Sequence, residues 1–202
     1  KLAAGECSSI LSKILNADSA IADLLSTSDK HPLFYKNTGM LYYTTFTRSA
    51  PECFINGKRA ASSRETRLKC ASDNAQKVMH ALLNSTLFYL NYQVYSNCRD
   101  LNPSDITTFR VPTTAFTDKR LLALSDELNE NQQSHSHFIV RNQKLTGEVR
   151  IQSFEPKASK PVINKIDEVL GMHYAMTDAE TDFVINYDIK SRMGQEEAED
   201  DE

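Results

Sequence analysis

The centre of the expected fold is the segment Val78–Val94, which reads VMHALLNSTLFYLNYQV. Its apolar residues recur at intervals of three and four positions, which places them on one face of an α-helix. Asp73, just upstream, is of a residue type that caps helix N-termini. The pattern therefore predicts one long helix that begins near Asp73, runs to Val94 and forms the middle of the core.

Several short segments on either side of this helix have the composition of β-strands. They are rich in aromatic and β-branched residues or alternate polar with apolar ones. These segments are residues 33–35, 41–47, 66–70, 106–112, 138–140 and 149–151. Turn-forming residues at 37–39 join the first two segments into a hairpin, and those at 144–147 join the last two.

Further helices are expected at both ends of the chain. Apolar residues from Ile10 to Leu24 follow the same spacing and predict a helix over residues 7–25. Others are expected around Leu121–Leu128, around Ile163–Leu170 and from Thr177 onward. This order of elements predicts an α+β fold, with mixed helices, a small and mostly antiparallel sheet, and a C-terminal helical segment.

The composition is that of a globular protein, with 40% hydrophobic and 25% charged residues in a chain of 202. No run approaches the roughly 20 apolar residues of a membrane span, and the N-terminal residues lack the pattern of a signal peptide. The four cysteines, Cys7, Cys53, Cys70 and Cys98, do not have the spacing of a metal site. We therefore expect a cytoplasmic protein with reduced cysteines and no membrane partner.

The net charge of −4 originates at the C-terminus. Six of the 27 acidic residues lie in residues 195–202, which contain no base. Residues 1–194 carry 23 bases and 21 acids, so this part of the chain is slightly basic. We therefore divide the chain into a connecting helix over residues 1–28, a folded domain over residues 29–194 and a disordered acidic tail over residues 195–202.

Motifs of the common catalytic sites are absent from the sequence. It contains no glycine-rich dinucleotide or phosphate loop, no GxSxG motif and no HExxH motif. His135 and His137 would share one face of a strand, but no third metal ligand is evident beside them. The sequence therefore predicts neither catalytic residues nor metal ligands in this chain.

One basic segment could bind nucleic acid. Its residues are Arg48, Lys58, Arg59, Ser62, Ser63, Arg64, Arg67 and Lys69. Between positions 58 and 69 the only acidic residue is Glu65. Lysine, arginine and serine bind phosphate oxygens, and arginine also reads guanine in the major groove. These eight residues are the predicted DNA-binding residues, and the alternative interpretation is a solvated charged loop between two strands.

Four motifs resemble those of a known family. They read HPLFYKNTGMLYY (31–43), ALLNSTLFY (81–89), DITTFRVP (105–112) and MTDAETDFVINYDIK (176–190). Together they resemble the C-terminal target-recognition region of bacterial adenine-specific DNA methyltransferases. That family includes restriction–modification enzymes that fuse nuclease, methylase and specificity regions. The resemblance extends over residues 31–112 and 160–194.

The resemblance implies a DNA sequence-recognition domain whose partner is double-stranded DNA. The catalytic domain of that family binds S-adenosylmethionine and has an Asn/Asp-Pro-Pro-Tyr motif that holds a flipped adenine. Asn102-Pro103-Ser104-Asp105 matches only the first two residues of that motif. We therefore expect no methyl transfer by this chain and no cofactor bound to it. An upstream methyltransferase domain of the same polypeptide would bind S-adenosylmethionine.

Two other functions are compatible with the sequence. A protein-interaction module would use the apolar face from Ile10 to Leu24 together with the acidic tail. A metal-dependent nuclease would use Asp126, Glu155 and Lys157, although the helix expected around Asp126 and the intervening proline both disfavour that site. Asn84 and Ser85, in the family-like motif of the long helix, are interpreted as packing or helix-bending residues rather than base readers.

Overall fold

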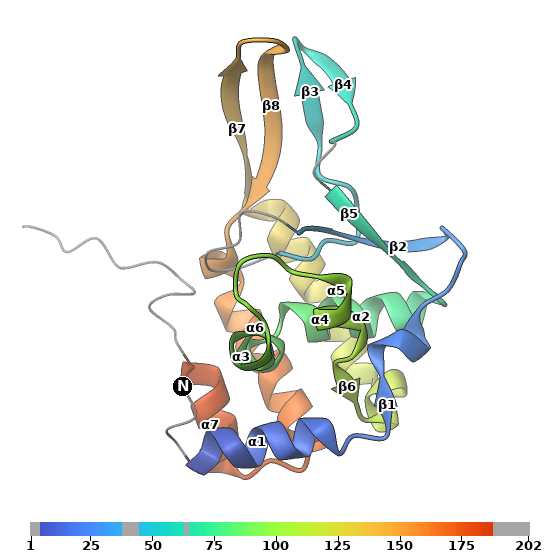
Figure 1. Ribbon diagram of the computed structural model, residues 1–202, viewed down its shortest axis with the longest axis vertical. Helices are drawn as coiled ribbons and strands as arrows, with labels where there is room; N and C mark the ends of the chain where they lie inside the picture. The colour runs from blue at the N-terminus through green and yellow to red at the C-terminus, as the bar shows by residue number, and fades with distance from the viewer. Residues whose placement is uncertain (1–4, 38–44, 63–64, 188–202) are drawn as a thin grey trace, which may run out of the picture.

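Two consecutive helices, α2 (Asp73–Asn84) and α3 (Thr86–Tyr95), lie at the centre of the molecule and meet at Ser85 (Figure 1). The structure is a computed structural model that describes residues 5–37, 45–62 and 65–187. The Ser72 hydroxyl accepts a hydrogen bond from the Ala75 amide, and the Ser85 hydroxyl accepts one from the Phe88 amide, each at 3.1 Å. Each helix therefore begins at its own serine cap, and the prediction of one continuous helix capped by Asp73 is wrong.

Buried side chains stabilise the break between these helices. The Asp167 carboxylate accepts hydrogen bonds from the Thr86 amide at 2.9 Å and the Leu87 amide at 3.2 Å. The Asn84 side chain accepts from the Phe46 amide at 3.1 Å and donates to the Phe46 carbonyl at 3.0 Å. These contacts satisfy backbone groups at the junction that a continuous helix would have paired internally. They agree with the interpretation of Asn84 and Ser85 as packing and helix-bending residues.

The other helices surround this centre. They are α1 (Gly5–Leu15), α4 (Pro103–Thr107), α5 (Lys119–Ser134), α6 (Pro156–His173) and α7 (Asp178–Asn186), with short 3-10 helices η1 (Ile21–Leu24) and η2 (Thr113–Thr117). The helix expected over residues 7–25 ends at Leu15, because Asp23 binds the Ser19 hydroxyl and the Ala20 amide and holds the next residues extended. The run at 106–112 is extended only at Arg110–Val111.

Three antiparallel sheets complete an α+β fold, as predicted. Two of them are strand pairs: β1 (Ser19–Ala20) with β6 (Arg110–Val111), and β2 (His31–Lys36) with β5 (Glu65–Cys70). The third has the order β4 (Lys58–Ala60), β3 (Cys53–Ile55), β8 (Gly147–Phe154) and β7 (Ser136–Gln143). The hairpin expected around residues 144–147 is therefore confirmed. The hairpin expected around residues 37–39 is only partly described: Thr47 bridges Phe34, whereas residues 38–44 lie outside the described parts.

The core lies between the helices and the β2–β5 pair. The apolar face of the first segment belongs to it, since Ile10 and Ile21 are fully buried and Ile14 is 1% exposed. Cys7, Cys53 and Cys70 are buried free thiols, and Cys98 is partly exposed. An interaction module cannot use the face from Ile10 to Leu24, because that face packs within this chain. Among the described helices, none is both long and apolar enough to cross a membrane.

Candidate nucleic-acid interface

The four-stranded sheet projects from the helical body as an arm, which consists of residues 52–60 and 136–154 (Figure 1). Two hairpins, β3–β4 and β7–β8, lie side by side in it and are joined by the antiparallel pairing of β3 with β8. Leu145, in the turn between β7 and β8, is fully exposed. The arm therefore presents both of its edges and its tip to the surroundings.

Asn56 holds the tips of the two hairpins together. Asn56 and Gly57 form the tight turn between β3 and β4, with positive φ angles of 51° and 77°. The Asn56 side chain donates to the Thr146 carbonyl and accepts from the Glu148 amide, both at 3.0 Å. These bonds connect the turn of one hairpin to the turn of the other, so the arm is tied at its tip as well as along its strands.

One face of the arm carries aromatic and cationic side chains. Phe54 of β3 is paired in register with Arg150 of β8 on one side and Arg59 of β4 on the other, so the three side chains share that face. Arg150 Cζ lies 4.9 Å from the centre of the Phe54 ring and 4.3 Å from that of Phe138. The two rings thus flank the Arg150 guanidinium in a double cation–π contact.

The other face carries apolar residues between two cations. Ile55 of β3 pairs with Lys58 of β4 and with Val149 of β8, and Val149 pairs with Arg141 of β7. Lys58 and Arg141 therefore lie at the two edges of one cross-strand row. This arrangement places a cation on each outer strand of the arm.

The arm is basic, and most of its cations are not neutralised. Its residues include five bases and two acids. Within the described residues, only Arg59 of these five bases forms an ion pair, with Glu52 at 3.5 Å between exposed side chains. The four bases without a recorded hydrogen bond or ion pair to a described residue are Lys58, Arg141, Lys144 and Arg150. Such charges are available to phosphate oxygens.

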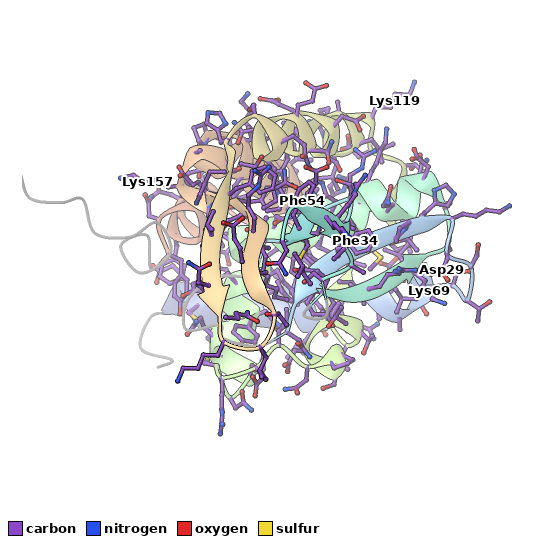
Figure 2. The ribbon with its side chains drawn as sticks, turned by 90° about the horizontal axis from the view of Figure 1, so that it is seen from above. Asp29, Phe34, Phe54, Lys69, Lys119 and Lys157 are labelled. Carbon is purple, nitrogen blue, oxygen red and sulfur yellow. The ribbon has the colours of Figure 1, made fainter. Side chains whose placement is uncertain are left out.

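The residues predicted to bind DNA divide into separate groups. Lys58 and Arg59 lie on β4 of the arm. Arg67 and Lys69 lie on β5 and both pair with the exposed carboxylate of Asp29, at 3.2 and 3.1 Å. Figure 2 shows Asp29 and Lys69 together at one end of the β2–β5 pair. The hydrogen bonds from Lys69 and then Arg67 lower the pKa of Asp29, so this pair of cations is partly neutralised.

The remaining predicted residues contribute little to an exposed basic surface. Arg48 has a side chain 20% exposed and donates to Asp126 at 2.5 Å. Ser62 hydrogen-bonds Glu65. Ser63 and Arg64 lie outside the described residues. The structure thus brings only Lys58 and Arg59 of the predicted set into the arm.

The carboxylate proposed for a nuclease site is also paired within the body. Besides Arg48, Asp126 binds the Lys77 ammonium at 2.8 Å through its second oxygen. Partial burial would raise the pKa of Asp126, but the hydrogen bonds from Lys77 and Arg48 outweigh it and lower that pKa. Among the described residues, no cluster of three or more His, Cys, Asp or Glu side chains could hold a metal ion.

The most informative arm residues are ones that the basic segment does not contain. Arg141, Lys144 and Arg150 are separated from Lys58 by more than eighty residues of sequence. Only the pairing of β3 with β8 brings the two hairpins together, and neither hairpin alone predicts it. The alternation of residues 147–154 does carry a signal, because it places Arg150 and Gln152 on one face of the strand.

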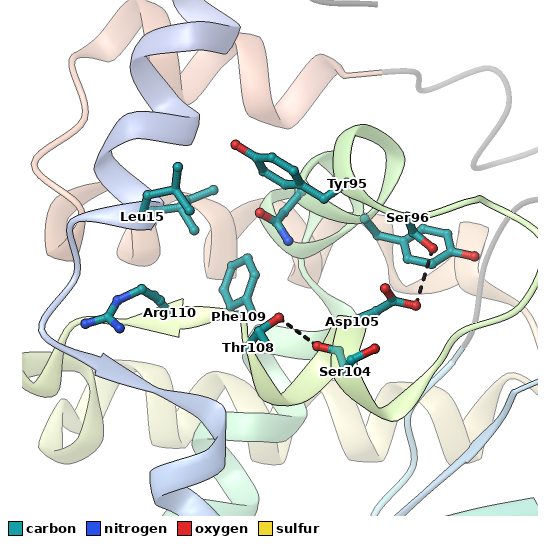
Figure 3. Close-up of a pocket in the computed structure, with 11 residues that line it drawn as sticks. Leu15, Tyr95, Ser96, Ser104, Asp105, Thr108, Phe109 and Arg110 are labelled. Atoms are coloured by element: carbon teal, nitrogen blue, oxygen red, sulfur yellow. Dashed lines mark hydrogen bonds between the residues drawn. The ribbon is translucent and has the colours of Figure 1, made fainter.

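A separate pocket of about 320 Å³ lies on the helical body (Figure 3). Tyr95 and Phe109 contribute aromatic walls, and Asp105 and Arg110 contribute charges. Both charged groups already have structural partners: Asp105 accepts from the Asn102 amide at 2.8 Å, and Arg110 Nε donates to the Ala17 carbonyl at 2.7 Å. Because these contacts organise the surrounding loops, the pocket is a weaker candidate site than the arm.

A second polar cluster contains the residue types of a hydrolase triad. His173 lies 2.9 Å from both the Thr114 hydroxyl and the Asp118 carboxylate. Asp118 also caps α5, accepting from the Arg120 amide at 2.7 Å. The cluster thereby joins the end of α6 to η2 and to the start of α5, which is a structural role. Searches of protein-family models, curated proteins and solved structures found no match to this chain.

Proposed function

We propose that this chain recognises double-stranded DNA through its projecting arm. The observation that carries the proposal is the set of cations on the arm without acidic partners among the described residues. Phosphate groups would neutralise these charges, and release of counterions from the duplex would supply salt-dependent affinity. The arm also offers a sheet whose edge and tip are narrow enough for a DNA groove, since the major groove admits a two-stranded ribbon.

The sequence resemblance supports a more specific role in the same proposal. The chain would be the target-recognition domain of an adenine-specific DNA methyltransferase from a restriction–modification system in the bacterial cytoplasm. It would position DNA for a catalytic domain upstream in the same polypeptide. S-adenosylmethionine and methyl transfer belong to that catalytic domain in this proposal, and this chain supplies recognition alone.

The test is duplex binding measured by fluorescence anisotropy over a range of salt concentrations. The Lys58→Ala/Arg141→Ala variant removes one cation from each outer strand of the arm. The matched control, Lys119→Ala/Lys157→Ala, removes two exposed cations that lie at other edges of the molecule (Figure 2). Both variants lose the same net charge, so long-range electrostatics affects them alike.

The proposal expects the arm variant to bind less tightly and to have a shallower salt dependence, by up to about 0.9 per lost phosphate contact. The control should follow the unsubstituted protein closely. Equal weakening of both variants, or no measurable duplex binding by the unsubstituted chain at low salt, would contradict DNA recognition by the arm.

The apolar surface of β7 favours a second candidate, a protein-interaction module. Val140 is 53% exposed on this edge strand, and Leu145 at the adjoining turn is 100% exposed. An edge strand can pair with a strand of another chain. This alternative predicts a partner complex that forms without DNA, which sedimentation with and without duplex would distinguish.

A further inference from the structure

Arg150 differs from every other cation of the arm in how its side chain is held. It lies on β8, an inner strand of the sheet, whereas Lys58, Arg59 and Arg141 lie on the outer strands. Phe54 is its direct cross-strand neighbour, and Phe138 is its diagonal neighbour on β7. Contacts with both rings restrict the rotamers of the arginine before any ligand arrives, which lowers the entropic cost of binding.

The guanidinium keeps its hydrogen-bonding capacity in this position. Stacking on aromatic rings uses the faces of the planar group and leaves the N–H donors at its edge. Among the described residues, Arg150 has no recorded hydrogen bond or ion pair, although Glu148 lies two positions away on the same strand. The donors are therefore available to a planar ligand that presents two acceptors side by side.

We infer that Arg150 is a specificity-determining residue that reads a guanine in the major groove of duplex DNA. Guanine presents O6 and N7 as adjacent acceptors there, which matches the two parallel donors of a guanidinium. The cations on the outer strands and Lys144 at the tip would contact phosphates on either side, in keeping with the opposite charge of the duplex. This inference rests on the proposed function and adds to it the residue and the base.

The experiment selects binding sites from a random duplex library with the complete chain and with two variants. Arg150→Lys keeps the positive charge but lacks the planar fork, and Arg150→Gln removes the charge. Arg59→Lys is the matched control, because Arg59 lies on the same face but on an outer strand. Thermal unfolding by circular dichroism establishes that each variant is folded.

The selected site is then synthesised with 7-deazaguanine at each guanine in turn, which removes only the N7 acceptor. The unsubstituted chain should prefer a site with at least one guanine and lose about tenfold or more in affinity when that guanine is modified. Arg150→Lys should lose the preference at that position, bind random duplex within about twofold of the unsubstituted chain and be insensitive to the modified base. Arg59→Lys should keep the preference.

Two results would overturn the inference while leaving the proposed function intact. One is salt-dependent duplex binding without sequence preference, and the other is an unchanged selected site in both Arg150 variants. If the unsubstituted chain binds no duplex at low salt, the proposed function fails as well. Loss of all duplex binding in a folded Arg150→Lys variant would assign Arg150 to phosphate contact and would also overturn base reading.

Discussion

Arg48 Nη1 lies 2.5 Å from Asp126 Oδ1, and the bond joins the segment before β3 to helix α5. Lys77 of α2 approaches the other oxygen of the same carboxylate at 2.8 Å. One acidic side chain therefore binds cations from two separate parts of the chain. This relationship makes Arg48 a stabilising residue of the body, although its position in the sequence suggests a DNA contact.

Replacement of Arg48 should accordingly affect stability more than DNA binding. We expect Arg48→Ala to lower the free energy of unfolding by about 1 kcal/mol, the upper range for a partly exposed ion pair, and to leave duplex affinity close to that of the unsubstituted chain. Urea unfolding and anisotropy measure the two effects on the same protein. Undiminished stability together with an affinity loss as large as that of Lys58→Ala/Arg141→Ala would contradict this assignment.

The tip of the arm should be sensitive to a methyl group at Gly147. This residue has a φ of +78°, and a Cβ atom there would overlap the Asn56 side chain that ties the two hairpins. Gly57 has a similar φ of +77° but has open space around it, so Gly57→Ala is the matched control. Backbone strain of about 1–2 kcal/mol applies to both substitutions, and the overlap applies only to Gly147→Ala.

We therefore expect Gly147→Ala to unfold at lower urea concentration than Gly57→Ala and to bind duplex less tightly. The amide of Glu148, which donates to Asn56, should also exchange faster with solvent deuterons. Equal stability and equal exchange in the two variants would show that the Asn56 connection does not hold the tips together.

Asp167 should contribute strongly to stability through the break between α2 and α3. It is 2% exposed and accepts from two backbone amides in the first turn of α3. Asp167→Ala would leave these amides buried without that acceptor, so we expect a loss of about 3 kcal/mol or more in the free energy of unfolding. Asp167→Asn retains one acceptor oxygen and should lose less.

The control for this prediction is Asp18→Ala. Asp18 also accepts two hydrogen bonds, from the amide and hydroxyl of Thr113, but these bonds are exposed to water. Chemical denaturation should rank the losses as Asp167→Ala, then Asp167→Asn, then Asp18→Ala. A loss for Asp167→Ala no larger than that for Asp18→Ala would remove the buried carboxylate as the reason for the break.

His80 should make stability depend on pH in a defined window. Its ring is fully buried, with Nδ1 3.0 Å from the Ser125 hydroxyl and Nε2 3.0 Å from the Gln132 side-chain oxygen. Burial lowers the pKa of His80 from 6.5 to about 4 and outweighs the hydrogen bond from Gln132, which acts in the opposite direction. Between these two values the unfolded chain binds a proton that the folded chain does not.

The free energy of unfolding should therefore be highest above pH 6.5 and fall as the pH is lowered toward 4. The slope contributed by one such group is about 1.4 kcal/mol per pH unit at most. Glu180, whose pKa is lowered from 4.5 to about 2, loses its contribution only below pH 4.5, so the two effects can be separated. Urea unfolding of His80→Gln should show a flatter dependence between pH 4.5 and 6.5, and an unchanged slope would contradict the assignment.

The sequence predicts the elements of this fold better than their partners. Local spacing identified the β7–β8 hairpin and the closing helices, because each of these patterns is complete within a short segment. It missed the break at Ser85, since Asp167 lies some eighty residues away and the apolar stripe continues on both sides of the break. Tertiary contacts overrode the local periodicity there.

The candidate interface was predictable only in part, for the same reason. Lys58 and Arg59 are recognisable as basic residues in sequence, but their availability depends on which acids lie nearby in space. Arg48 and Arg67 look equivalent to them in sequence, yet each has an acidic partner from a distant segment. The ring contacts of Arg150 depend on the register of three strands, which only the assembled sheet defines.

The most direct test of the account is where duplex DNA contacts this protein. A photo-crosslinking residue, p-benzoylphenylalanine, can replace Leu145 at the tip of the arm or Met172 near the end of α6, which are 100% and 55% exposed. Irradiation with a labelled duplex at low salt should give crosslinks from position 145 and background yield from position 172. Crosslinks from position 172 alone, or equal yields from both positions, would contradict DNA recognition by the arm.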